Sequence, residues 1–208
     1  MKIDISQEAQ RSISEAIRSA EAQSSAEIVT VVTPSSDDYL VIPVLWAALG
    51  ALLFPALPIL FAMPISQEEL YGLQLILFLV LLAVGRIDPL LYRLIPPSVK
   101  RARARAAARQ HFLSLQVHGT RRRASVMLFV SIAERYVEIL TDTEVAQRIP
   151  DTAWEAVVGT FVTHVKAGKV EVGFVEAVRQ SGELLKGTFP FDPEETDELT
   201  NHLIIIER

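Results

Sequence analysis

Two long apolar runs dominate the hydrophobic pattern of this 208-residue chain. Residues 39–63 and 70–84 carry no charged side chain, and only the predicted turn 64–69 separates them. At about 1.5 Å per residue, the first run can cross roughly 30 Å of hydrocarbon, whereas the second spans about 22 Å. The second helix therefore needs residues 85–87, local bilayer thinning or a re-entrant path. The pattern predicts a two-helix transmembrane hairpin. A buried hairpin in a soluble domain would need a larger shell than the remaining chain provides.

The pattern before the apolar runs predicts one helix followed by one strand. Residues 6–22 have apolar positions at helical spacing, and Ser6 is suited to cap this helix. Residues 27–33 form a β-branched run that is typical of a central strand. Because one helix and one strand cannot fold alone, the rest of their sheet must come from beyond the hairpin.

The pattern after the apolar runs supplies the missing strands. Residues 125–132 are almost continuously apolar, which is typical of a strand buried on both faces. Residues 136–140 predict a second strand antiparallel to the first. The apolar residues 203–206 predict either an edge strand or a packed patch. Helices are predicted over 99–116, from 151 to Gly168, and over 171–186, and a short segment, 90–95, is expected at the headgroup level with Asp88 as its cap.

These elements together define the expected fold class. It is an α/β fold, a three-layer α/β/α sandwich with a small mixed sheet, interrupted by the two-helix transmembrane hairpin. Residues 1–38 form the first part of the domain, 39–97 the hairpin with its interfacial segment, and 98–208 the second part.

Charge is distributed unevenly around the apolar runs, although the net charge is only −5. Residues 86–123 contain ten basic side chains and one acidic one, whereas residues 124–208 contain seven basic and fifteen acidic ones. By the positive-inside rule the basic block lies in the cytoplasm, and two crossings place both termini there. The N-terminus does not show the pattern of a cleaved signal peptide. We therefore expect a two-span protein of the cytoplasmic membrane.

The basic block around residue 100 has three interpretations. Contact with anionic lipid headgroups is favoured, because each base near such a surface gains about 1 kcal/mol. A solvated face is the second interpretation. Nucleic-acid binding is disfavoured because no aromatic residues interleave with the bases, so we expect no nucleic-acid partner. The side chains expected to contact headgroups are Arg86, Arg93, Lys100, Arg101, Arg103 and Arg105.

Carboxylates near strand ends are the best candidates for binding chemistry. The candidate cation or ligand residues are Glu27, Glu134, Asp142 and Asp197, and the possible metal ligands are Asp142, Glu144 and Asp197. Ca²⁺ prefers such oxygen ligands, so it is the possible cofactor. Salt bridges and turn contacts are nevertheless the favoured roles of these carboxylates, and we expect that no cofactor is required. Glu134 and Asp142 would lie at opposite ends of their strand pair, so they do not form one acid/base pair.

Other catalytic constellations find little support in the sequence. The absence of cysteine excludes disulfides, thiolate nucleophiles and cysteine-ligated metals. Ser131 has no identifiable His or Lys base, so it is a weak nucleophile candidate. His111 and His118 are seven residues apart beside Gly119, and a surface or packing role is favoured over a metal pair.

An ordered set of motifs outside the apolar runs resembles the TPM domain family. It comprises Glu21 with Glu27-Ile28-Val29, Phe112-Leu113 with Thr120, the block from Val126 to Asp142, and Trp154, Gly168, Gly173, Ala177, Gly182 and Phe189-Pro190. The resemblance implies an α/β/α fold and is to a membrane-anchored bacterial member of the family; the charge pattern places the chain in the inner (cytoplasmic) membrane. Phosphatase activity, calcium binding and assistance to membrane complexes are also associated with the family. Because none of them is uniform in the family, the resemblance does not by itself assign any of them to this chain. The chain departs from the pattern in its inserted hairpin, its expected cytoplasmic domain and Asp197-Glu198-Leu199 in place of Asn-Glu-Leu.

Three functions compete on this basis. The favoured one is a membrane-anchored, non-enzymatic cytoplasmic domain that binds, helps assemble or monitors other membrane proteins, with the bilayer and those proteins as partners. The second is a divalent-cation-assisted, phosphatase-like hydrolase. The third is an anionic-lipid or nucleotide sensor that uses the basic block.

Overall fold

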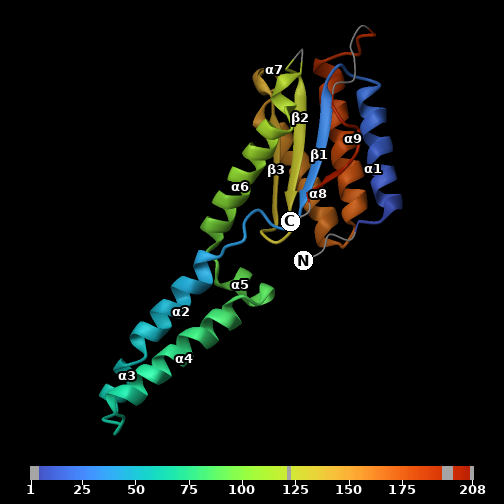
Figure 1. Ribbon diagram of the computed structural model, residues 1–208. Helices are drawn as coiled ribbons and strands as arrows, with labels where there is room; N and C mark the ends of the chain where they lie inside the picture. The colour runs from blue at the N-terminus through green and yellow to red at the C-terminus, as the bar shows by residue number, and fades with distance from the viewer. Residues whose placement is uncertain (1–4, 121–122, 194–198, 207–208) are drawn as a thin grey trace. The chain divides into compact units, whose positions relative to one another are not determined.

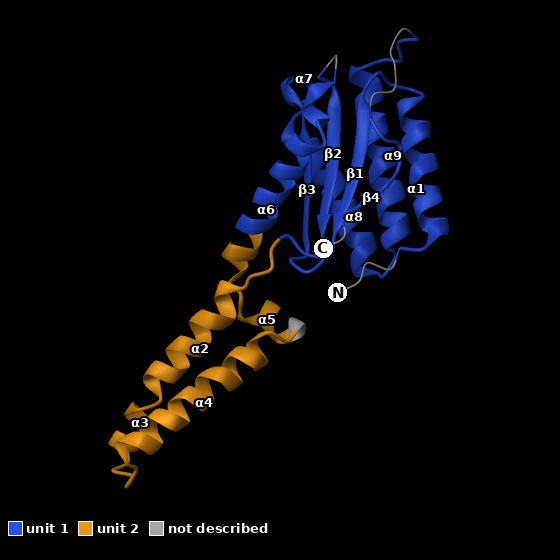
Figure 2. Ribbon diagram, in the orientation of Figure 1, with its two compact units in different colours: residues 1–36, 102–208 blue, residues 37–101 orange. Residues whose placement is uncertain are grey.

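The computed structural model describes residues 5–120, 123–193 and 199–206 (Figure 1). The chain forms two compact units, which Figure 2 colours separately. Residues 1–36 and 102–208 make up one unit, here called the globular unit, and residues 37–101 make up the other, here called the hairpin unit.

A mixed sheet lies at the centre of the globular unit. In the part of the chain that the structure describes, its strands are β1 (Glu27–Thr33), β2 (Ser125–Ser131), β3 (Tyr136–Thr141) and β4 (Ile204–Ile205), in the order β3-β2-β1-β4. β1 is parallel to both β2 and β4, whereas β2 and β3 are antiparallel. The predicted central strand and antiparallel pair are thus confirmed. Residues 203–206 were expected to form either an edge strand or a packed patch, and they contribute the edge strand β4.

Helices cover both faces of this sheet (Figure 1). On one face, α1 (Gln7–Glu21), α8 (Asp151–Lys166) and α9 (Val170–Thr188) form the larger core together with Ile28 and Val32 of β1. On the other face, the C-terminal part of α6 (Pro97–Ser114) packs on Val29 and Val31. Alternate β1 side chains therefore fill two cores, and the predicted three-layer α/β/α class is confirmed.

Several boundaries differ from the sequence prediction. α7 (Thr143–Arg148) was not predicted, because six residues are too few to show a helical period. α5 (Asp88–Leu94) begins at Asp88 instead of being capped by it, and α6 begins at Pro97, two residues before the predicted start at residue 99. α9 continues through Gly187, where an end was expected, whereas Gly168 does end α8, in the left-handed region with φ +75°. A 3₁₀ turn, η1 (Val117–Gly119), leads towards β2.

The hairpin unit contains two antiparallel helical arms. The first arm consists of α2 (Val41–Leu53) and α3 (Ala56–Leu60), and the second is α4 (Gln67–Gly85). A capping box between Ser66 and Glu69 starts α4, so Glu69 lies in the helix and not in the predicted turn. The 19 residues of α4 span about 28 Å, which removes the shortfall expected for the second apolar run. By length and composition, Val41–Leu60 and Gln67–Gly85 could each cross a membrane.

A glycine contact holds α1 against α9 and generates the first prediction. A Cβ on Gly182 would lie 2.7 Å from the Cβ and 3.3 Å from the Cα of Ala20, so Gly182→Ala should force the two helices apart. We expect the free energy of unfolding to fall by about 1–3 kcal/mol, measured by chemical denaturation of the full chain.

Gly187→Ala is the matched control for this prediction. Gly187 lies in the same helix, and a Cβ there would meet nothing within 4 Å. This variant should be neutral or stabilising by about 0.5 kcal/mol through helix propensity. Equal effects of the two substitutions would contradict the proposed close approach of α1 and α9.

Candidate functional site

The candidate residues lie at two opposite ends of the sheet, as the directions of the strands show. Ser36 follows the end of β1, and Ser131 is the last residue of the parallel strand β2, so these residues share one end, here called the Ser36 end. Glu27 starts β1, and Asp142 follows the antiparallel strand β3, so they share the other end, here called the Glu27 end. Glu134 follows β2 at the Ser36 end. The prediction that Glu134 and Asp142 lie at opposite ends is confirmed.

A buried polar cluster occupies the Ser36 end. Glu134 Oε1 accepts hydrogen bonds from the Ser36 backbone N–H at 3.0 Å and from Ser35 Oγ at 3.2 Å. Glu134 Oε2 accepts one from Ser131 Oγ, and Ser36 Oγ donates to Ser131 Oγ at 2.8 Å. Glu134, Ser36 and Ser131 are all buried. This carboxylate therefore fastens the segment that follows β1 onto the end of β2, and the Ser131 hydroxyl is enclosed.

Asp142 has a structural role at the Glu27 end. Its Oδ1 accepts hydrogen bonds from the Thr143 N–H at 2.6 Å and from Thr143 Oγ1 at 3.2 Å, at the start of α7. Only 5% of Asp142 is exposed, and among the described residues its Oδ2 has no hydrogen-bond partner. Thr120 Oγ1 is likewise buried and has no partner among them. Asp142 thus combines a capping bond with one unused oxygen.

Of the other two metal candidates, Glu144 lies among the described residues and is engaged elsewhere. Glu144 forms an ion pair with Arg148 one turn along α7, at 2.8 Å. Asp197 lies outside the described residues. Within the described residues no three metal-ligating side chains converge on one point, as the oxygen cage of Ca²⁺ requires.

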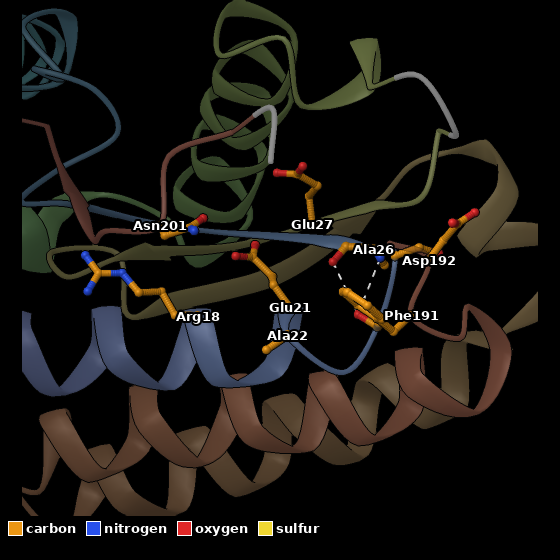
Figure 3. Close-up of a pocket in the computed structure, with 10 residues that line it drawn as sticks. Arg18, Glu21, Ala22, Ala26, Glu27, Phe191, Asp192 and Asn201 are labelled. Carbon is orange, nitrogen blue, oxygen red and sulfur yellow. Dashed lines mark hydrogen bonds between the residues drawn. The ribbon is translucent and has the colours of Figure 1, made fainter. Parts of the chain in front are cut away.

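A cavity of about 230 Å³ opens at the Glu27 end (Figure 3). Its polar lining residues are Arg18, Glu21, Ser24, Ser25, Glu27, Asp192 and Asn201. Glu21 Oε1 accepts a hydrogen bond from the Ile28 N–H at 2.9 Å, and Glu27 Oε2 accepts one from the Leu199 N–H at 2.9 Å. Both carboxylates therefore satisfy backbone groups beside β1 as well as lining the cavity. The sequence identified Glu27, but Arg18 and Asn201 carried no signal, and Glu21 was noted only within the family motif.

The predicted headgroup residues belong to both units. Arg86, Arg93 and Arg101 are exposed in the hairpin unit, and Lys100 is half-buried there. Arg105 lies in the globular unit, where its Nε contacts Glu138 Oε1 at 3.4 Å. Glu138 also accepts a hydrogen bond from the Tyr136 hydroxyl at 2.8 Å, and burial together with this bond raises the pKa of Tyr136. Arg103, the remaining residue of the set, is exposed in the globular unit.

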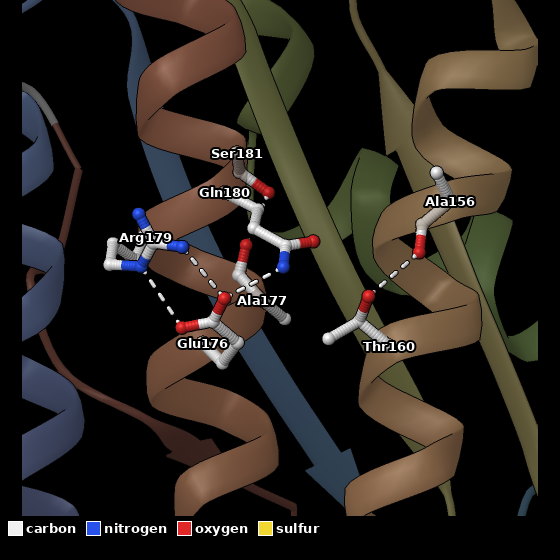
Figure 4. Close-up of polar contacts among 7 residues, drawn as sticks. All are labelled: Ala156, Thr160, Glu176, Ala177, Arg179, Gln180 and Ser181. Carbon is white, nitrogen blue, oxygen red and sulfur yellow. Dashed lines mark hydrogen bonds and ion pairs between the residues drawn. The ribbon is translucent and has the colours of Figure 1, made fainter.

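A carboxylate with a strongly lowered pKa, Glu176, lies on the surface of α9. Glu176 accepts two hydrogen bonds from Arg179, at 2.9 Å and 2.7 Å, and one from Gln180 at 2.7 Å (Figure 4). The bonds from Arg179, and then the bond from Gln180, lower the pKa of Glu176 to about 2. Because the group forms bonds within one turn of α9, we assign it to the helix surface and not to a binding site.

Comparisons with known proteins agree with this α/β/α architecture. Residues 94–184 match the family model described as TPM domain. This match confirms the predicted resemblance to the TPM domain family. The NMR structure of the BA42 protein from the psychrophilic bacterium Bizionia argentinensis superimposes with a TM-score of 0.63 at 16% identity, covering 99% of this chain and 97% of that one. At this identity the likeness shows a shared fold. No curated protein matches the sequence significantly.

The buried cluster at the Ser36 end generates the second prediction. Glu134→Ala removes the acceptor for the Ser36 N–H and for two serine hydroxyls, leaving buried donors unsatisfied. We expect the free energy of unfolding to fall by about 2–4 kcal/mol, since each orphaned buried donor costs about 1–3 kcal/mol.

Glu144→Ala is the control for this prediction. It also removes a bonded carboxylate, but from an exposed ion pair on α7, so its cost should stay below about 1 kcal/mol. Both variants are measured by urea unfolding of the full chain, followed by far-UV circular dichroism. Similar midpoints for the two variants would refute the anchoring role of Glu134.

Proposed function

We propose that this chain is an integral membrane protein whose TPM domain binds other membrane proteins, or helps them assemble, without catalysing a reaction. The observation that carries the proposal is the apolar outer surface of the hairpin unit. Three considerations support it: the hairpin's fit to a bilayer, the charge around it, and the structural use of the candidate carboxylates.

The hairpin unit exposes apolar side chains along both arms. Val41 is 75% exposed, Leu60 77% and Ile76 59%. The residues that α2 buries are Pro43, Ala47 and Ala51, and a Cβ on Gly50 would meet Leu81 at 2.6 Å. This hairpin has small residues between its helices and large apolar side chains on its outer surface. Such an arrangement is typical of helices packed in lipid and is unfavourable in water.

Aromatic residues near both ends of the hairpin fit the two bilayer interfaces. Trp46 lies near the start of α2 and Tyr71 near the start of α4, and both are exposed. Because the two helices are antiparallel, these starts lie at opposite ends of the hairpin. Trp and Tyr concentrate at the two membrane–water interfaces, so this placement suits a full crossing by each arm.

The proposed orientation places both termini in the cytoplasm of a bacterial cell. The basic residues 86–123 immediately follow α4, whereas the hairpin tip near Ser66 carries Glu68 and Glu69. This asymmetry follows the positive-inside rule. The bases Arg86, Arg93, Lys100 and Arg101 would then contact anionic headgroups. A reporter fused after Arg208 that is active only outside the cytoplasm would reverse this assignment.

The non-enzymatic role is supported by how the candidate carboxylates are used. Glu134 fastens two segments of the sheet, Asp142 caps α7, and Glu144 pairs with Arg148. Glu27 holds the backbone at Leu199. Because these acidic groups stabilise the fold, they are less suited to catalysis. We therefore favour a role in which the domain presents its surface to a partner.

A divalent-cation-assisted, phosphatase-like hydrolase is the second candidate function. The observation that favours it is the buried Oδ2 of Asp142 near the start of α7, which has no hydrogen-bond partner in the described part of the chain. A cation or a substrate hydroxyl would satisfy this oxygen. Among the described residues, no three metal-ligating side chains converge. We therefore prefer the binding function to the hydrolase.

The third prediction places Trp46 within the bilayer. Trp154→Phe leaves Trp46 as the single tryptophan, and it should be tolerated because the buried Trp154 Nε1 has no partner among the described residues. In vesicles, lipids brominated along their acyl chains should quench Trp46 strongly. Emission that is quenched by aqueous acrylamide but not by brominated lipid would contradict membrane insertion.

The fourth prediction separates the two candidate functions with Asp142→Asn. Asparagine caps helices as well as aspartate does, so the fold should remain while the negative charge is lost. Wild-type and variant chains, purified in mild detergent, should retain the same co-purifying membrane proteins by mass spectrometry. A chain with an unrelated two-span hairpin in place of residues 39–97 controls for partners that bind through the membrane segment.

The same Asp142→Asn sample also tests the hydrolase directly. Turnover of p-nitrophenyl phosphate with Ca²⁺, Mg²⁺ or Mn²⁺ should be absent from both proteins if the first candidate holds. Turnover by the wild type that Asp142→Asn abolishes, with unchanged circular dichroism, would establish the hydrolase and displace the binding function.

A further inference from the structure

The turn between α8 and α9 is an exposed surface that the proposed function does not use. We call residues 165–172 the α8–α9 corner. Its valines Val165, Val170 and Val172 are 38%, 37% and 47% exposed, and its lysines Lys166 and Lys169 are also exposed. The corner is therefore both apolar and basic.

The corner is a well-formed turn, so its exposure is a built feature of the fold. Gly168 adopts φ +75°, and the Lys169 N–H donates to the His164 carbonyl at 2.9 Å. Immediately inside the corner, Phe161 and Phe174 are buried and pack edge to face with their centroids 5.0 Å apart. The valines thus lie outside this buried aromatic contact, where their apolar surface meets solvent.

The corner lies at the Ser36 end of the globular unit. The opposite end of α9 is tied to the Glu27 end, because the Ser25 N–H donates to the Phe189 carbonyl at 3.1 Å. α9 is about 28 Å long and β1 about 23 Å, so the start of α9 reaches the end of β1. Figure 1 shows the α8–α9 turn near the arrowhead of β1.

Both chain connections to the hairpin unit also leave from the Ser36 end. Ser36 is bonded there by Glu134, and Arg105 of α6 contacts Glu138, which pairs with Phe129 in the second half of β2. Residues 37–40 separate Ser36 from α2, a chain length of about 17 Å at full extension. A bilayer that holds α2 is thus within a short tether of this end.

The exposed charge at the Ser36 end suits an anionic surface. Arg135 in the β2–β3 turn joins Lys166 and Lys169 as exposed bases. Of the acids at this end, Glu134 is buried in hydrogen bonds, whereas Asp37, Glu138 and Glu171 are half-buried. Two acids are exposed there, Glu8 at the start of α1 and Asp38 just beyond Ser36. Lysines beside an apolar surface are the combination that anchors peripheral elements among lipid headgroups.

We propose that the α8–α9 corner contacts the bilayer surface, with its valines among the headgroups and Lys166 and Lys169 on anionic lipid phosphates. This inference rests on the proposed membrane insertion of the hairpin unit, and it adds a second contact made by the TPM domain itself. That contact would fix which end of the domain faces the lipid and which end faces partners.

The test uses single cysteines, since the chain has none of its own. Val170→Cys reports on the corner, Thr152→Cys on the exposed other end of α8, and Leu79→Cys on the exposed side of α4. Each full-length variant carries a nitroxide label and is placed in vesicles of phosphatidylcholine with or without phosphatidylglycerol. Collision with oxygen, which favours lipid, is compared with collision with an aqueous nickel chelate by electron paramagnetic resonance.

The expected result is a severalfold higher oxygen-to-nickel ratio at residue 170 than at residue 152 in the anionic vesicles. Lys166→Gln with Lys169→Gln should lower that ratio towards the value at residue 152, while residue 79 keeps its lipid signature. A lipid signature at residue 79 with an aqueous one at residue 170 overturns the inference and leaves the proposed function intact. An aqueous signature at residue 79 overturns the proposed function and the inference with it.

Discussion

The pairing of β1 with β2 is the interaction on which this structure depends. The two strands are parallel over seven residue pairs, from Glu27↔Ser125 to Thr33↔Ser131, although the whole hairpin unit lies between them in the chain. They provide the core positions of both sheet faces, Ile28 and Val126 on one side and Val29 and Met127 on the other. Without this pairing, α1 and β1 would have no sheet to join.

The hairpin unit reduces the loss of conformational entropy that accompanies the pairing of β1 with β2. Its two arms are antiparallel, and at its base Tyr39 packs with Leu91 and Ile95 in a small buried cluster. The rings of Tyr39 and Tyr92 meet edge to face with centroids 6.0 Å apart. Because the folded insertion returns its own ends to one place, the effective loop between β1 and β2 is much shorter than the chain between them, which lowers the closure entropy.

The sequence predicts the fold well wherever a long regular pattern exists. The continuous apolar runs of β1 and β2 and the two arms of the hairpin are visible without any structure. α7 cannot be predicted from the pattern because it is a short helix that directly follows a strand. Its capping residue, Asp142, cannot be distinguished in the sequence from a metal or substrate ligand. The apolar pattern underestimates the length of the second arm because the first turn of α4 is polar, although a capping box makes Glu68 and Glu69 part of the helix.

The candidate site was harder to predict, because its meaning depends on contacts distant in the chain. Glu134 has the position expected of a ligand-binding carboxylate at a strand end, and nothing local shows that its main partner, Ser36, is 98 residues away. Similarly, Glu27 could be recognised as an acid that starts a strand, but not as the acceptor for Leu199. Composition identifies which groups are acidic, whereas only tertiary structure shows which of them are already engaged.

The two ends of the sheet have different roles as a result. The Ser36 end carries both connections to the hairpin unit and closes over a buried network of hydroxyls around Glu134. The Glu27 end carries the open cavity, with Glu21, Glu27 and Asn201 in its lining. A partner segment that reaches this cavity would meet neither the connecting chains nor the Ser36 cluster. Since the buried strands β1 and β2 join the two ends, such a partner would be held about one strand length from the point where the chain enters the hairpin.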